Sequence, residues 1–245
     1  MKQKLTSSLL FLMILSFIFV ETTGVSESKS GVKDLQIVFQ KNVGSKLLIS
    51  KESSYSFIKE DIVQELYLKK ILKDALVKIL SLKDANQSQC LVYVDRNPEK
   101  QVIVAGFFDV RRQSITIIGI DKVSTGNQKR RGYFITPVGI FEHSRDYQAL
   151  GTKNDKGWRG LGAKGSRVWD FGWRTTFNKK GEEVDIRLLM HATDPDFGES
   201  RLGRVASKGC VRISGKLNRF LDKYKILDGR GKYLMVGDSR LFNKS

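Results

Sequence analysis

Two short stretches decide the fold of this chain: residues 184–191, VDIRLLMH, and residues 207–212, SKGCVR. The first is rich in aliphatic residues and predicts a strand that ends on His191. The second places Cys210 directly after a glycine. Because the chain has only two histidines and two cysteines, their coincidence in this region is informative. We expect His191 to project from the strand end into a site that it shares with Cys210.

A cysteine and a histidine close together are typical of nucleophilic catalysis. A thiol is a poor nucleophile until it becomes a thiolate, and a nearby imidazole can take its proton. The alternatives are a structural histidine and a disulfide between Cys90 and Cys210. Cys90 opens the apolar run 91–94, which favours a buried strand residue over a disulfide partner. These scattered residues match no metal-ligand signature, so we expect no metal site.

The residues around Cys210 suit acyl transfer. Gly209 allows a sharp turn and a close approach of substrate. The backbone N–H groups of Gly209, Cys210 and Val211 are candidates to converge on a developing oxyanion. Lys208 and Arg212 flank the sulfur, and their positive charge favours the thiolate.

The rest of the chain divides into a helical and a β-rich part. Apolar residues recur at three- and four-residue steps over 55–82, which predicts one or two amphipathic helices. Residues 34–40 are predicted to form a strand. After residue 88 the pattern becomes mostly β. Strands are predicted at 91–95, 101–108, 114–120, 167–176, 184–191 and 233–236, and a helix at 216–224.

Residues 143–166 are predicted to form a long irregular loop. Loops of this length in compact domains often bind substrate. Tyr147 and Trp158 are therefore candidate substrate contacts, and the alternative is that these aromatic rings pin the loop to the body of the protein.

The N-terminus has the three-part pattern of a secretory signal peptide over residues 1–24. Two lysines precede a compact apolar run, and small and polar residues follow it. The apolar run is short for a membrane span, which needs about 20 residues. We expect an exported protein that meets the membrane only through this segment. An uncleaved anchor is the alternative, because the cleavage site lacks the usual Ala-x-Ala.

The composition describes a basic globular protein. Apolar residues make up 40% of the chain, which argues against disorder. The 43 Lys and Arg against 26 Asp and Glu give a net charge of +17, which favours anionic partners. Nucleic acid, anionic lipid and an acidic cell-wall polymer all qualify. No basic groove interleaved with aromatic residues is evident, so we expect no specific nucleic-acid binding.

Together, the motifs resemble those of the YkuD-type L,D-transpeptidases of bacterial cell walls. Their signature is His, a gap, then Ser or Thr, any residue, Gly, Cys, an aliphatic residue and often Arg. Here fifteen residues separate His191 from Ser207. An upstream block, VSTG at 123–126 and TPVGIF at 136–141, resembles the family's STG and TPxGxF strands. Two departures are Lys208, where many members have His, and Ala192, where Gly or Ser is usual.

The resemblance implies a mainly β, sandwich-like catalytic domain with few short helices over residues 89–238. A small helical region of unknown role, 25–88, would precede it, and a tail, 239–245, would follow. Cys210 would attack the third residue of a peptidoglycan tetrapeptide stem, with His191 as base. Ser207 and Arg212 would shape the site, and Lys208 would contact substrate.

The resemblance also implies that the reaction needs no metal or organic cofactor. The partners would be stem peptides in the periplasm or cell wall, and a wall-attached protein is a candidate acceptor. The alternatives are an L,D-carboxypeptidase and a non-catalytic wall-binding module of the same fold. A sortase-like transpeptidase is disfavoured by the order of the motifs.

Overall fold

The structure is a computed structural model that describes residues 29–44, 55–83, 85–148, 161–229 and 231–242. In chain order, the helices and strands are α1 (Lys29–Asn42), α2 (Tyr55–Leu80), β1 (Gln89–Asp95), β2 (Val102–Asp109), β3 (Ser114–Lys122), β4 (Gly139–Glu142), β5 (Arg145–Gln148), β6 (Arg167–Phe177), β7 (Glu183–Ala192), η1 (Glu199–Arg201), β8 (Val211–Ile213), α3 (Gly215–Lys223), β9 (Tyr233–Gly237) and η2 (Ser239–Leu241). None of the helices in these ranges is long and apolar enough to cross a membrane. The predicted signal peptide lies outside the described residues.

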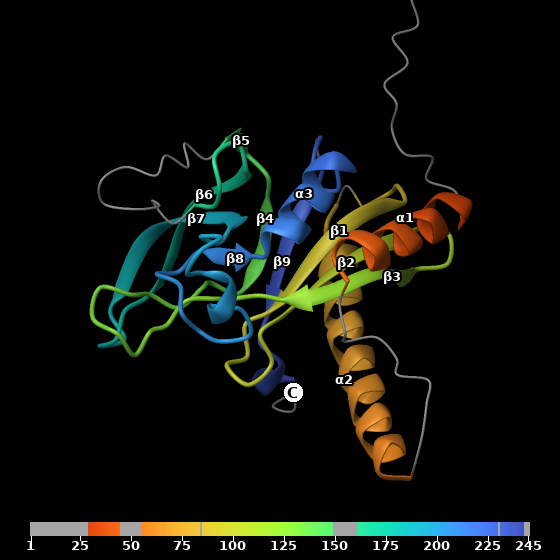
Figure 1. The fold of residues 1–245 in the computed structure, drawn as a ribbon, viewed down its shortest axis with the longest axis horizontal. Coiled ribbons are helices and arrows are strands. Elements are labelled where there is room, and N and C mark those ends of the chain that lie inside the picture. Colours follow the sequence, from red (N-terminus) through yellow and green to blue (C-terminus); the bar gives the residue numbers. More distant parts are fainter. Residues whose placement is uncertain (1–28, 45–54, 84, 149–160, 230, 243–245) are drawn as a thin grey trace, which may run out of the picture.

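The strands form two sheets that pack against each other (Figure 1). The five-stranded sheet has the order β3-β2-β1-β9-β4, and the four-stranded sheet has the order β5-β6-β7-β8. Val92 and Val94 of the first sheet share one buried cluster with Trp169, Leu188 and Val211 of the second. The expectation of a mainly β, sandwich-like fold is therefore confirmed.

The helices cover both faces of the five-stranded sheet. Leu35 and Phe39 of α1 join the cluster between the sheets, where α3 also packs. Ile71 and Ile79 of α2 lie in a second buried cluster, on the face that carries Tyr93. Successive residues of a strand point to opposite faces, so β1 contributes to both clusters. The helical N-terminal region thus shares its cores with the β-rich part.

The predicted strand at 34–40 is wrong, because these residues belong to α1. The buried side chains of this segment include Val32, Leu35, Phe39 and Val43, which recur at steps of three and four. Ile37, which completes the apparent β alternation, is 67% exposed. The helical period was present in the sequence, but the alternating triplet at 35, 37 and 39 masked it.

The irregular segment predicted at 143–166 begins differently in the structure. Residues 145–148 form β5, which pairs antiparallel with β6. The other predicted strands and the helix at 216–224 occur within a few residues of their predicted limits. Residues 239–241 form η2, and the Ser239 amide donates to the Asp95 carboxylate at 3.0 Å.

Candidate active site

The sheet register places His191 and Arg212 on one face. β7 and β8 are parallel, with His191 opposite Arg212 and Met190 opposite Val211. Met190 and Val211 point into the core between the sheets. Their neighbours along each strand therefore point to the opposite face. Cys210 directly precedes β8, and its Sγ lies beside β7, the strand that carries His191, at 3.8 Å from the carbonyl oxygen of Arg187.

His191 is held in one orientation by its own strand. The imidazole is 2% exposed, and its Nδ1 lies 2.7 Å from the carbonyl oxygen of Ala192. A carbonyl can only accept, so Nδ1 carries the hydrogen and Nε2 carries a free lone pair. Burial, reinforced by the charge of Arg212, lowers the pKa of His191 to about 4. The imidazole is therefore a neutral base at pH 7.

Cys210 and Cys90 of β1 are both partly exposed, and they form no disulfide. The Cys210 Sγ lies 3.8 Å from the carbonyl oxygen of Arg187. Burial raises the pKa of the Cys210 thiol above its ordinary value. A hydrogen bond to the Leu189 backbone and the charge of Arg212 oppose that rise. Among the described residues no hydrogen bond joins Cys210 to His191, and the two pKa shifts favour a neutral thiol and a neutral imidazole.

Lys208 lies in a different environment from the one its sequence position indicated. Its ammonium group stands 5.8 Å from the centre of the Tyr133 ring, and Arg130 lies over the same ring at 4.6 Å. The cation that acts on the pKa of the Cys210 thiol is Arg212.

The turn that carries Cys210 is braced by the Ser207 hydroxyl. Ser207 Oγ donates to the Cys210 carbonyl at 2.5 Å and accepts from the Gly209 N–H at 3.0 Å. Gly209 has φ +128°, and a Cβ there would lie 2.6 Å from Cδ1 of Ile186. The backbone angle favours glycine at this position, and a Cβ would also require the Ile186 side chain to shift.

The upstream block packs directly against this turn. Thr136 Oγ1 donates to the Gly209 carbonyl at 2.8 Å and accepts from the Gly126 N–H at 2.9 Å. A side chain at Gly126 would overlap the carbonyl of Phe134. Ser124 and Arg212 exchange two backbone hydrogen bonds of 2.9 Å. The two motif blocks, far apart in sequence, are therefore one structural unit.

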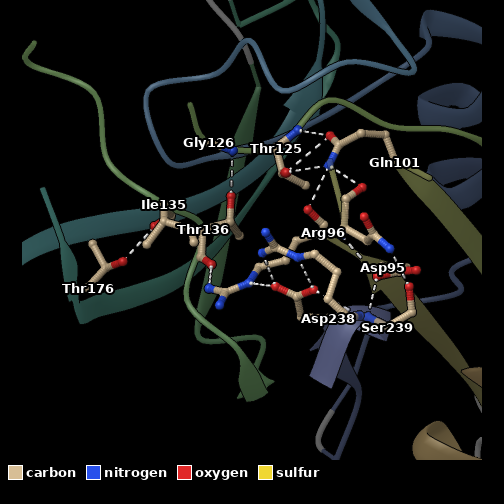
Figure 2. Close-up of polar contacts among 12 residues, drawn as sticks. Asp95, Arg96, Gln101, Thr125, Gly126, Ile135, Thr136, Thr176, Asp238 and Ser239 are labelled. Carbon is tan, nitrogen blue, oxygen red and sulfur yellow. Dashed lines mark hydrogen bonds and ion pairs between the residues drawn. The ribbon is translucent and has the colours of Figure 1, made fainter. Parts of the chain in front are cut away.

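A polar network holds Thr125 and Thr136 of the upstream block (Figure 2). Arg96 Nη1 donates to the Thr136 carbonyl at 2.5 Å, and Arg96 Nε pairs with Asp238 at 3.1 Å. The Thr125 N–H donates to Gln101 Oε1 at 2.7 Å. Arg96 is a β1-end residue that no motif singled out, so sequence reasoning missed this support.

Asp170 and Arg187 are two further residues of this face that sequence reasoning missed. Asp170 is buried and accepts from Arg187 Nε at 2.8 Å and from Nη2 at 2.5 Å. The Asp170 charge raises the pKa of the nearby Cys210 thiol. Arg187 precedes His191 by four residues in the same strand, so the alternation of β7 was a signal for its place on this face.

Arg212 is half-buried on the site face. Among the described residues no acidic side chain contacts its guanidinium, and its buried Nε has no hydrogen-bond partner. Burial lowers the pKa of Arg212, with a smaller lowering from the charge of Arg201. A guanidinium in this setting can donate hydrogen bonds to an anionic ligand.

Of the two predicted aromatic contacts, Tyr147 lies within the described residues. Tyr147 lies in β5 opposite Val168, which in turn lies opposite His191, so the three backbone positions form one row across the sheet. Trp158 lies outside the described residues. Among the described residues no three potential ligands gather into a metal site.

No family model matches the chain, and no curated protein matches it. Among solved structures it resembles Bd1075 of Bdellovibrio bacteriovorus, with 18% identity and a TM-score of 0.40 over 62% of this chain and 48% of that one. It also resembles an L,D-transpeptidase (residues 123–326) from Xylanimonas cellulosilytica, with 18% identity and a TM-score of 0.36 over 62% and 61% of the two chains.

A third similar structure is the helical cell shape determining protein Pgp2 from Campylobacter jejuni. The identity is 15% and the TM-score 0.36, over 69% of this chain and 56% of that one. The chain spans about half of Bd1075, at 48%, and less than two thirds of the other two proteins. With TM-scores below 0.5, these likenesses carry no weight for the reaction.

Proposed function

We propose that this protein is an exported, cysteine-dependent L,D-transpeptidase that acts on peptidoglycan tetrapeptide stems. One observation carries the proposal: a Ser-x-Gly-Cys turn is braced by two hydroxyl groups and lies beside the strand that carries a histidine with a free Nε2. A buried cysteine with a purely structural role needs neither the braced turn nor the oriented base.

The first half-reaction forms a thioester. As the Cys210 sulfur attacks the carbonyl carbon of the third stem residue, its proton passes to Nε2 of His191. The tetrahedral intermediate collapses with cleavage of the amide bond. The imidazolium returns the proton to the departing nitrogen, and the terminal D-alanine leaves as a neutral amine.

The second half-reaction transfers the acyl group to an amine. The acceptor is a second stem, giving a 3–3 crosslink, a protein lysine or a free D-amino acid. Its nitrogen attacks the thioester carbon while His191 takes a proton from it, and the thiol is restored. With water as acceptor the same cycle is an L,D-carboxypeptidase.

Of the three N–H groups that are candidates to stabilise the oxyanion, we favour that of Cys210. The Gly209 N–H already donates to Ser207 Oγ. Val211 belongs to the ladder between β7 and β8. The Cys210 N–H is thus the candidate donor of this turn. Arg212, which has no acidic partner among the described residues, is the group we assign to a substrate carboxylate.

The test is to incubate the purified protein with a disaccharide tetrapeptide and a D-amino acid. We expect a thioester adduct on Cys210 by mass spectrometry and an exchanged product by chromatography. Cys210→Ala and His191→Ala should each lose at least about 10²-fold in product formation, because each removes a group that acts in bond making.

Cys90→Ala and His143→Ala are the matched controls, since each removes the other residue of the same type. Full activity of Cys210→Ala would refute the proposal. A tripeptide product formed equally with and without the D-amino acid would identify the carboxypeptidase. Binding to isolated wall without any adduct would identify a non-catalytic module.

A further inference from the structure

We propose that Thr136 is a positioning residue that aims the Cys210 N–H at the oxyanion. This inference rests on the proposed function, because it concerns the transition state of the thioester-forming step. It is carried by hydrogen bonds on both peptide groups that flank the nucleophile.

The two peptide groups are held by different hydroxyls. Ser207 Oγ donates to the Cys210 carbonyl and so fixes the peptide between Cys210 and Val211. Thr136 Oγ1 donates to the Gly209 carbonyl and so fixes the peptide between Gly209 and Cys210. The second of these contains the candidate oxyanion donor.

The peptide geometry turns the Thr136 contact into a direction for the Cys210 N–H. In a planar trans peptide the C=O and N–H groups point in opposite directions. With the Gly209 carbonyl held toward Thr136, the Cys210 N–H points away from Thr136. Gly209 has φ +128° and no side chain, so little in its own backbone opposes rotation of this peptide.

The hydroxyl of Thr136 has only one arrangement that satisfies its neighbours. It has a single hydrogen, and the Gly126 N–H already donates to its oxygen at 2.9 Å. The hydrogen is therefore committed to the Gly209 carbonyl. Gly126 itself packs closely, because a side chain there would overlap the Phe134 carbonyl.

The backbone of Thr136 is also held, through a contact with Arg96 (Figure 2). Its carbonyl accepts from Arg96, and Arg96 pairs with the buried carboxylate of Asp238. Pro137 follows directly and restricts Thr136 to extended conformations. Thr136 thus connects the Arg96–Asp238 ion pair, next to the end of β1, to the peptide that carries the candidate oxyanion donor.

The test compares Thr136→Val, which keeps the shape without the hydroxyl, with Thr136→Ser, which keeps the hydroxyl. The rate of acyl-enzyme formation is measured by mass spectrometry after rapid quenching, as a function of tetrapeptide concentration. Alkylation of Cys210 by iodoacetamide is measured in parallel, because that reaction develops no oxyanion.

For Thr136→Val we expect the maximal acylation rate to fall about 10²- to 10³-fold, the loss typical of a removed oxyanion donor. The half-saturating tetrapeptide concentration and the alkylation rate should stay within about threefold of the wild type, since the thiol and the substrate contacts remain. Thr136→Ser should acylate within about tenfold of the wild type, because it keeps the donor hydroxyl.

A Thr136→Val protein that melts cooperatively and acylates at the wild-type rate would overturn the inference, and so would an equal loss of acylation and alkylation. If Thr136→Val does not fold, the Thr136→Ser result decides: a larger loss than tenfold overturns the inference. Absence of acyl-enzyme in the wild type is a separate failure, that of the proposed function.

Discussion

The proposed catalytic pair is neutral at rest, because desolvation disfavours the charged form of each member. Burial lowers the pKa of His191 to about 4 and raises the pKa of Cys210. Both shifts oppose the thiolate–imidazolium pair that activates many cysteine enzymes. The proton therefore moves during attack on the substrate. Arg212 lowers the pKa of both groups, so it favours the thiolate while it opposes the imidazolium.

The lowered pKa of His191 predicts a dependence of stability on pH. Between about pH 4 and 6.5 the unfolded chain binds a proton at this position that the folded chain does not. The free energy of unfolding should therefore rise over this window by up to about 3 kcal/mol. Above the window, this contribution of His191 should be complete and constant. Urea unfolding at several pH values measures it.

His191→Gln should remove this part of the slope, and His143→Gln should keep it. The difference between variants isolates one histidine from the carboxylates that titrate in the same window. An identical pH dependence in wild type and His191→Gln would contradict the assigned pKa.

At the residue scale, the sequence predicted the turn that carries Cys210 better than it predicted the distant residues that contact this turn. Gly209 and Ser207 stand beside Cys210 in the chain, and their roles follow from local chemistry. The contact of Thr136 with Gly209 spans 73 positions, and only the folded sheets bring them together. The motif spacing marked Thr136 as part of the family block but gave no physical reason for it.

At the scale of elements, the two N-terminal helices show where periodicity decides and where it fails. α2 has apolar residues at helical steps over many turns, and its prediction is confirmed. α1 is shorter, and three alternating apolar residues were enough to indicate a strand. Only packing on the sheet distinguishes the two patterns, since it buries Phe39 and leaves Ile37 exposed.

The packing of α2 predicts which of its faces supports the fold. Ile79 is fully buried, whereas Val77, two positions earlier, is 60% exposed. Ile79→Ala should lower the free energy of unfolding by about 2–5 kcal/mol, because it leaves a cavity against the sheet. Val77→Ala should change it by less than about 0.5 kcal/mol. Urea unfolding compares the two, and equal effects would show that α2 does not pack as described.

At the scale of the whole molecule, the helical and β-rich parts form one packed body. The five-stranded sheet has α2 on one face, and α1 and the second sheet on the other. The predicted boundary near residue 88 separates a helical pattern of sequence from a β-rich one. The hydrophobic clusters nevertheless contain residues from both sides of it. This arrangement braces the layer that carries Arg96, whose contact with Thr136 leads to the proposed active site.

The net charge of +17 predicts how the whole protein would bind an anionic wall polymer, the proposed partner. If the proposed substrate is an anionic wall polymer, its capture is long-range and screened by salt. The Debye length falls from about 10 Å at 0.1 M to about 3 Å at 1 M ionic strength. Co-sedimentation with isolated wall material should therefore fall steeply over that range. Cys210→Ala should follow the same curve, because the charge, and not the thiol, makes this contact. Binding that is unchanged at 1 M salt would assign retention to specific contacts instead of the overall field.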